Sequence, residues 1–290
     1  KMMRRFRILE SAKEDYKAFD SETRSMLDSY TAGINAFLES TTSFPIEYTM
    51  LDASPELWEP WDSLAVFKVR HIQMGVFESK LWRMRLVKIL GPEKASRLLP
   101  GYQQNHLVIV PPEATFQGPM VDALEQLCRG SEIISAMDEI GSGSNSWVLS
   151  GIHTASGKPL LAGDPHRGLD VPNVYYQCHV SCPDFDVVGL SFAGCPGFPH
   201  FGHNSQVAWC ITHAGADYQD LYLEHFNEGV LTHYEFEGKW EPLQTTQEII
   251  KVRDGSDVTI HTFSTHHGPV ITENLSSGFG IAFRYTSTAE

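Results

Sequence analysis

The sequence lacks any run of 18 apolar residues, so it is not predicted to form a membrane-spanning helix. Positive charge is also scarce, since 22 Lys and Arg stand against 36 Asp and Glu, a net charge of −14. This balance argues against a nucleic-acid partner, because phosphate binding needs clustered positive charge. The 290 residues are otherwise ordinary for a globular protein, 42% hydrophobic and 20% charged. They suffice for one large core or two smaller ones.

Cysteine is infrequent as well. The five cysteines are an odd number at irregular spacing and give no disulfide framework. Cys178 and Cys182 would face the same side of a strand, but no second pair of cysteines follows them. We therefore expect two small buried hydrophobic side chains here rather than a metal site.

The ends of the sequence show no targeting segment. Residues Lys1 to Arg7 are basic, but no apolar stretch follows them, so they do not form a signal peptide. Apolar residues then recur at helical spacing, and the sequence stops just after the strand-like run 280–285. We expect a piece truncated at both ends, so the lack of a leader does not indicate a compartment.

The first 98 or so residues have helical periodicity. Ser21 is expected to cap a helix whose apolar stripe is Met26, Leu27, Tyr30, Ile34, Phe37 and Leu38. Asp62 or Ser63 can cap a second helix. A third runs through 81–90 and ends at Gly91-Pro92. Its basic residues are expected to form a solvated face: Lys80, Arg83, Arg85 and Lys88.

From Ser146 onward, short β-branched or aromatic runs alternate with turn residues, which predicts a strand-rich part. The expected strands are 146–150, 159–162, 174–180, 187–192, 207–212, 221–226, 249–252, 258–263 and 280–285. Between the two parts, 111–143 is typical of a linker with one short helix at 121–128. The predicted class is α+β, with a helical N-terminal half and a strand-rich C-terminal half.

The run Gly141-Ser-Gly-Ser-Asn-Ser-Trp-Val148 carries the chemistry. Small residues lead directly into a strand, and the hydroxyl of Ser144 can attack the preceding carbonyl of Gly143. If that bond breaks, Ser144 gains a free α-amine of pKa about 7.7–8.0 beside its own hydroxyl. The nucleophile then carries its own general base. Taken alone, the run is more simply a linker turn before a strand.

Other motifs accompany this run, and together they resemble the penicillin acylase family in content and order. That family includes penicillin G acylases, cephalosporin acylases and homoserine-lactone acylases. The similar segments span about residues 20 to 286. They are 30–37 and 59–62 in the first half, and 143–148, 157–166, 197–204, 207–209, 216–222 and 267–270 in the second.

The resemblance implies an N-terminal-nucleophile (Ntn) hydrolase fold, a four-layer αββα sandwich built from two subunits of one precursor. By this resemblance, residues 1–110 belong to the helical α subunit, 111–143 form a linker or spacer, and 144–290 begin the β subunit. The implied activity is hydrolysis of a linear amide in an N-acyl compound. It follows self-cleavage between Gly143 and Ser144 and passes through an acyl-enzyme on Ser144. Helices followed by strands are compatible with this fold but do not identify it.

The resemblance also implies catalytic roles. Ser144 matches the nucleophile. His166 lies where family members place a residue that touches it, and an imidazole there can orient the amine and hydroxyl and assist proton transfer. His213 matches the position whose backbone N–H forms half of the oxyanion hole. The other donor is an asparagine side chain that falls beyond Glu290, so the piece alone is expected to be nearly inactive.

Binding residues are implied in the same way. Arg167 and Phe201 fall where the family lines its acyl pocket. Asp217, Asp220 and the carbonyl of Gln219 match ligands of a structural calcium ion, one per αβ pair, which Glu78 would complete. Solvated loop acids are the alternative for this last group. His200-x-x-His203 suggests zinc, but belongs to a structural turn in the family.

Two other functions stay open. One is a Ser144-His166-Asp164 hydrolase without self-cleavage, although no Gly-x-Ser-x-Gly elbow frames Ser144. The other is an uncleaved, non-catalytic binding module. For the leading hypothesis we expect a small N-acyl substrate, an αβ heterodimer, no organic cofactor and a periplasmic or secreted location. The natural acyl group and the excision of a spacer are left open.

Overall fold

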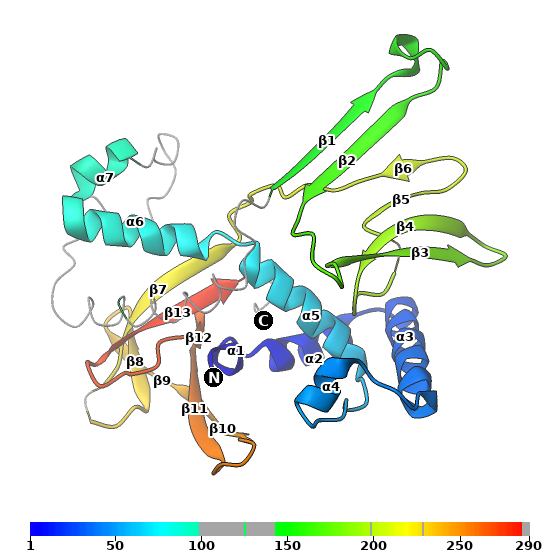
Figure 1. Ribbon diagram of the computed structural model, residues 1–290. Helices are drawn as coiled ribbons and strands as arrows, with labels where there is room; N and C mark the ends of the chain where they lie inside the picture. Colours follow the sequence, from blue (N-terminus) through cyan, green and yellow to red (C-terminus); the bar gives the residue numbers. More distant parts are fainter. Residues whose placement is uncertain (99–124, 126–142, 198, 228, 286–290) are drawn as a thin grey trace. The chain divides into compact units, whose positions relative to one another are not determined.

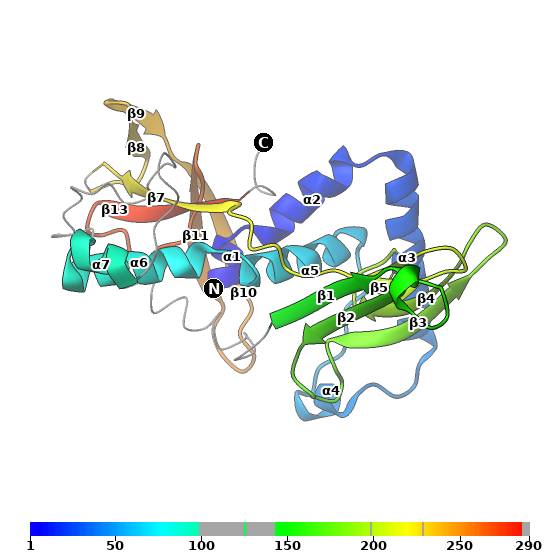
Figure 2. The same cartoon turned by 90° about the horizontal axis from the view of Figure 1, so that it is seen from above.

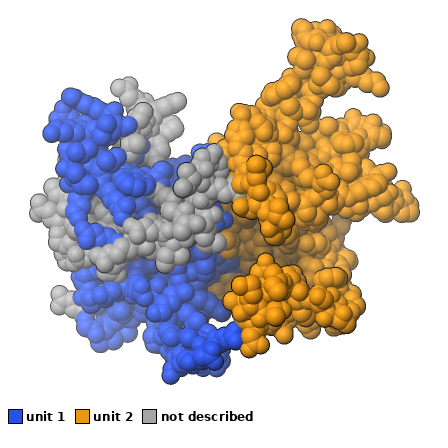
Figure 3. Space-filling view, in the orientation of Figure 1, with its two compact units in different colours: residues 1–8, 73–137, 215–290 blue, residues 9–72, 138–214 orange. Residues whose placement is uncertain are grey.

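The computed structural model describes residues 1–98, 125, 143–197, 199–227 and 229–285. Helices up to residue 98 and antiparallel strands from residue 143 confirm the α+β class. The chain divides into two compact units (Figure 3). Each of them combines helices with strands. Unit 1 is residues 1–8, 73–137 and 215–290, and unit 2 is residues 9–72 and 138–214. The boundaries of the predicted linker 111–143 stay a prediction, because nearly all of it, with the helix expected at 121–128, lies outside the described residues.

Unit 2 takes in most of α2 (Ile8–Ala18) and α5 (Pro60–Gln73), with α3 (Ser21–Ser40) and α4 (Ile46–Met50). The cap of α3 is Asp20, whose carboxylate accepts a hydrogen bond from the Thr23 N–H at 2.8 Å, so the predicted cap at Ser21 is one residue late. Pro60 begins α5, because the first helical position needs no N–H donor. Asp62 therefore lies inside the first turn.

Two polar contacts join the helices of unit 2. The Asn35 side chain donates to the Trp58 carbonyl at 2.9 Å and accepts from the Trp58 N–H at 2.7 Å, which ties the loop before α5 to α3. Lys68 of α5, only 4% exposed, forms an ion pair with Asp15 of α2 at 2.6 Å. The helices of this unit are thus held by specific side chains as well as by apolar packing.

The strands of unit 2 form a hairpin and a small sheet (Figure 1). The hairpin pairs β1 (Gly143–Leu149) with β2 (Leu160–His166). The antiparallel sheet has the order β3-β4-β5-β6, formed by β3 (Tyr175–Ser181), β4 (Asp186–Phe192), β5 (Phe201–His203) and β6 (Ala208–Trp209). Cys178 is half-buried and Cys182, just past β3, is exposed, so the expected burial is wrong for Cys182.

Unit 1 is built on a five-stranded antiparallel sheet of order β10-β11-β12-β13-β7. Its strands are β7 (Gln219–His225), β10 (Gln244–Ile250), β11 (Val258–Thr265), β12 (Gly268–Val270) and β13 (Phe279–Tyr285), with β8 (His233–Phe236) and β9 (Lys239–Pro242) as a separate hairpin. Its helices are α1 (Met2–Arg5), α6 (Phe77–Leu90) and α7 (Pro92–Leu98). Figures 1 and 2 show α6 beside β7 and β13.

Three aromatic rings form the centre of unit 1. Phe6, Phe77 and Phe283 are at most 1% exposed and meet edge to face, with ring centroids 5.1–6.3 Å apart. Edge-to-face pairs add to the stabilisation from area burial. They join α6 to β13, so the first turn of α6 has a fixed place against the sheet.

The four-layer αββα arrangement implied by the resemblance stays an expectation. Within the described part of the chain, no helix is long and apolar enough to cross a membrane.

Candidate active site

Ser144 is the second residue of β1, at the open end of the hairpin. It is half-buried and lies opposite Pro165, which has no N–H to donate across the ladder. Successive side chains of a strand point to opposite faces, so Ser144 shares a face with Ser146. The Ser146 hydroxyl lies 2.8 Å from the sulfur of Cys210, which follows β6. The Ser144 side chain therefore lies on the face that the Cys210 segment contacts.

The opposite face of the hairpin carries a polar cluster. Asp164 and His166 lie two residues apart on β2, and Asn145 is paired directly with Asp164. The His166 Nε2 atom lies 3.0 Å from an Asp164 carboxylate oxygen and 3.1 Å from the Asn145 amide nitrogen. One ring nitrogen cannot donate to Asp164 and accept from Asn145 at once. The two neighbours therefore favour different tautomers of His166.

His166 also lies against the predicted cleavage junction. It is paired with Gly143, and a methyl group added to Gly143 would lie 3.2 Å from the other ring nitrogen, Nδ1. The structure thus brings His166 to the backbone of Gly143, whereas strand alternation directs the Ser144 hydroxyl to the other face. The role of His166 beside the nucleophile stays a prediction. The alternative Ser-His-Asp triad has its His166–Asp164 contact but not the serine–histidine contact.

His213 lies in the exposed segment between β6 and β7, three residues after Cys210. Cys210 itself contacts the Ala162 carbonyl of β2 at 3.6 Å, so this segment passes beside the hairpin before reaching His213. Burial lowers the pKa of His71 in the same unit. The positive charge of Lys68 and, to a lesser extent, that of His213 lower it further. The oxyanion role of the His213 N–H stays a prediction.

The two predicted pocket residues are placed differently. Phe201, 9% exposed, lines a mostly apolar, open hollow together with residues such as Leu161, Leu190 and Ala208. Neither Ser144 nor His166 nor Arg167 lines that hollow. Arg167 is half-buried, and its Nε atom has no hydrogen-bond partner among the described residues. The hollow that Phe201 lines does not include Arg167, and the substrate-binding roles of both residues stay a prediction.

The surroundings of His200 favour packing over metal binding. Its ring stacks on Phe67 and meets Phe192 edge to face, at centroid distances of 6.3 and 4.4 Å. Burial and, to a lesser extent, the charge of Arg70 lower its pKa. Among the described residues there is no group of three or more His, Cys, Asp or Glu that could hold a metal ion.

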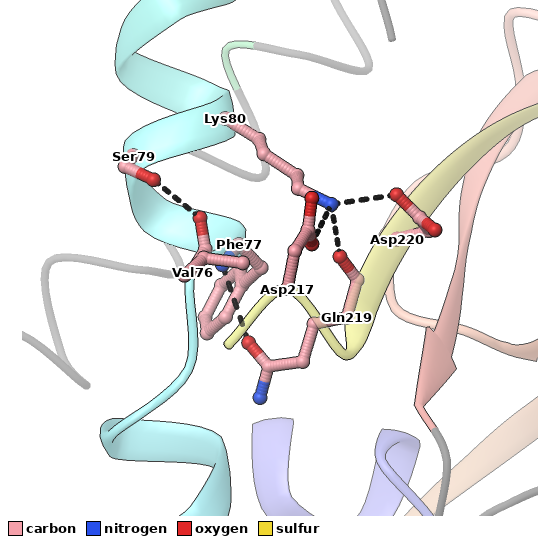
Figure 4. Close-up of polar contacts among 7 residues, drawn as sticks. All are labelled: Val76, Phe77, Ser79, Lys80, Asp217, Gln219 and Asp220. Atoms are coloured by element: carbon pink, nitrogen blue, oxygen red, sulfur yellow. Dashed lines mark hydrogen bonds and ion pairs between the residues drawn. The ribbon is translucent and has the colours of Figure 1, made fainter. Parts of the chain in front are cut away.

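The predicted calcium ligands lie in unit 1, and a lysine lies between them (Figure 4). The Lys80 ammonium is 2.6 Å from Asp217 Oδ1 and 2.6 Å from Asp220 Oδ1, and it also donates to the carbonyl of Gln219. Its side chain is only 3% exposed, so the expectation that Lys80 belongs to a solvated face is wrong. The reason is that two carboxylates and a carbonyl compensate the buried charge.

These residues do not fit a calcium ion as they stand. Calcium binds oxygen at 2.3–2.6 Å, and the ammonium stands at that distance from both carboxylates. The backbone of Glu78 lies in α6, but its side chain is outside what the structure describes. The calcium ion itself stays a prediction.

The spacing of apolar residues in α6 indicates that Lys80 faces inward. Phe77 and Leu81 are 0% and 2% exposed, and Lys80 lies at the i+3 position from the first and directly before the second. Positions i, i+3 and i+4 share one helical face, so Lys80 belongs to the inward face of α6. The partners of His166, by contrast, depend on the pairing of β1 with β2, which no local pattern gives.

The hairpin thus places a Gly-Ser bond at its open end, with an imidazole against the glycine. The penicillin amidase family model matches residues 1–290, and the chain belongs to this family. The chain is 40% identical over 298 residues to "Penicillin acylase 2 proenzyme" of Pseudomonas sp. (strain SE83), covering 100% of this chain and 38% of that protein.

The chain is also similar to two further proteins. The chain is 27% identical over 304 residues to the acyl-homoserine lactone acylase QuiP of Pseudomonas aeruginosa, covering 98% of this chain and 36% of that protein. A solved thermostable penicillin G acylase from Alcaligenes faecalis matches with a TM-score of 0.44 and 27% identity, over 48% of this chain and 25% of that one. The family assignment rests on the sequence matches. The chain spans less than two fifths of the length of these curated relatives.

Proposed function

We propose that the full-length protein hydrolyses a linear amide bond in an N-acyl compound, after cutting itself between Gly143 and Ser144. The observation that carries this proposal is the position of the Gly143–Ser144 bond, at the first pair of the hairpin and directly against the His166 ring. Membership of the penicillin amidase family supports it, as does the word proenzyme in the name of a relative.

The self-cleavage step uses only the serine and water. The Ser144 Oγ attacks the carbonyl carbon of Gly143, the C–N bond breaks, and the proton of the hydroxyl passes to the departing amine. The resulting ester is hydrolysed by water, which leaves a carboxylate on Gly143 and a free amine and hydroxyl on Ser144. An α-amine with a pKa of about 7.7–8.0 is partly unprotonated near neutral pH.

The same serine then carries the acyl transfer. Its hydroxyl gives its proton, through water, to the Ser144 amine and attacks the acyl carbonyl; the leaving amine takes a proton, and water hydrolyses the acyl-enzyme. Because His166 lies against Gly143 rather than against the Ser144 hydroxyl, we assign it to positioning the new α-amine. The His213 N–H is assigned to one half of the oxyanion hole.

The substrate class follows from the relatives. Their names indicate penicillin acylases and acyl-homoserine lactone acylases, so we propose N-acyl compounds of these types, with Arg167 and Phe201 in the acyl site. The two halves of the cut chain would form an αβ heterodimer. As for much of the family, the location is proposed to be periplasmic or extracellular.

The test compares two neighbouring serines in the full-length protein. Ser144→Ala should abolish release of amine from penicillin G and from an acyl-homoserine lactone, because the nucleophile is lost. Ser146→Ala removes a hydroxyl from the same face of the same strand and should keep hydrolysis within an order of magnitude of wild type. Unchanged turnover in Ser144→Ala would refute the assignment, and equal losses in both variants would show a general effect on the hairpin.

A further inference from the structure

Four hydrogen bonds join the first turn of α6 to the start of β7 within unit 1 (Figure 4). The Lys80 ammonium donates to the carboxylates of Asp217 and Asp220 and to the Gln219 carbonyl. The Gln219 side-chain oxygen accepts from the Phe77 N–H at 3.2 Å. We call these five residues the Lys80 clasp.

The Lys80 ammonium has as many N–H donors as there are oxygen atoms facing it in the clasp. A protonated lysine has three N–H donors, and three oxygens receive them here. Burial lowers the pKa of Lys80, but the hydrogen bonds to Asp217 and Asp220 and their negative charges together raise it by more, so the net shift is upward. The two carboxylate side chains are 41% and 47% exposed, so water also solvates them.

A bound divalent ion would need the same space. In the observed arrangement the Lys80 nitrogen already occupies the point that faces Asp217 Oδ1, Asp220 Oδ1 and the Gln219 carbonyl together, at the distance a calcium ion would take from the two carboxylates. The ammonium and the ion would also repel each other. Binding of the metal therefore requires Lys80 to leave a buried position in which its three donors are used.

We propose that Lys80 is the built-in cation of this chain, and that it joins α6 to β7 without a bound metal. The proposal departs from the calcium site that the family resemblance implies. The proposal also explains why a lysine occupies an inward position of α6, where an apolar residue would otherwise be expected.

One consequence rests on the proposed function. Lys80 precedes Gly143 in the chain, whereas Asp217 and Asp220 follow Ser144, so a cut between Gly143 and Ser144 leaves the clasp between the two products. The clasp itself does not depend on the cut. In Ser144→Ala, which stays uncut by that proposal, loss of Lys80 should still lower the melting temperature, so failure of one proposal is distinguishable from failure of the other.

The first test uses the wild-type full-length protein. Elemental analysis of purified protein should find no stoichiometric calcium, and the melting temperature should be the same with EDTA and with added calcium chloride. One calcium per chain, together with a lower melting temperature in EDTA, would overturn the proposal.

The second test uses matched lysine variants of α6. Lys80→Met should lower the melting temperature, on the order of 5 °C, with no response to EDTA. Lys88→Met, the control, removes an exposed lysine of the same helix that pairs with Glu125 at 2.8 Å, and should have a much smaller effect. Equal melting temperatures for the two variants would overturn the proposal. Lys80→Glu supplies a third carboxylate, and a melting temperature that calcium raises in this variant alone would support it.

Discussion

Gly75, just before α6, has no room for a side chain, and this predicts a large effect of Gly75→Ala. A methyl group at Gly75 would lie 1.8 Å from the Gln219 Oε1 atom and within 2.0 Å of the other amide atoms. Gln219 is fully buried, and its Oε1 accepts from the Phe77 N–H at the start of α6. The amide must therefore move by more than 1 Å, which breaks this hydrogen bond and disturbs the start of β7.

The magnitude follows from two terms. A buried amide that loses its partner costs about 1–3 kcal/mol, and forcing extra volume into a packed site costs about 1–3 kcal/mol. The sum is roughly 2–6 kcal/mol, at about 2–4 °C per kcal/mol for a domain of this size. We expect the melting temperature of Gly75→Ala to fall by on the order of 10 °C.

The assay is thermal unfolding of the full-length protein followed by circular dichroism. Gly33→Ala is the matched control, because it lies in α3 with no atom within 4 Å of an added methyl group. This control should stabilise the protein slightly, since alanine favours helix over glycine by about 0.5–1 kcal/mol. If Gly75→Ala melts within 2 °C of Gly33→Ala, about the effect of a helix-propensity change, the placement of Gln219 over Gly75 is wrong.

Three side chains of unit 2 can be tested separately: His200, Asn35 and Arg167. Burial and then the charge of Arg70 lower the pKa of His200 below 6.5, so the unfolded state takes up the proton first; the melting temperature should drop as pH falls below about 6.5, and His200→Gln should flatten that slope. Asn35→Ala loses both hydrogen bonds to Trp58 and should lower the free energy of unfolding by about 1–3 kcal/mol in urea titrations; an unchanged urea midpoint would contradict this. Arg167→Ala should weaken binding of an acyl substrate with a distal carboxylate more than that of an aryl-acetyl one, by about 10-fold or more; equal losses would place Arg167 outside the acyl site.

The sequence predicted long, periodic elements well and short ones poorly. The end of α6 at Gly91 and the strands that became β3, β4, β11 and β13 follow from local pattern. The strands β5, β8, β9 and β12 have only three or four residues, too few for an alternation to show. The strand expected at 207–212 is only Ala208–Trp209, because the chain leaves the sheet to run beside the hairpin.

The residues of the candidate site were proposed from sequence motifs, but their geometry does not follow from the sequence. The motif around Ser144 marks the strand start, yet the face on which the hydroxyl lies depends on the register that pairs Gly143 with His166. A one-residue slip would exchange the two faces. For Lys80 the expected solvated face was wrong, although its helical spacing from Phe77 indicates an inward position; the two carboxylates that compensate it lie 137 and 140 residues away in sequence.

The amino terminus created in purified full-length protein tests the proposed cut most directly. N-terminal sequencing and intact mass of the wild-type protein should find two fragments, one of which begins Ser144-Asn-Ser-Trp. The same measurement on Ser144→Ala should find a single uncut chain, whereas Ser146→Ala should be cut like wild type. A single uncut and active wild-type chain, or a cut Ser144→Ala chain, would contradict self-cleavage by Ser144.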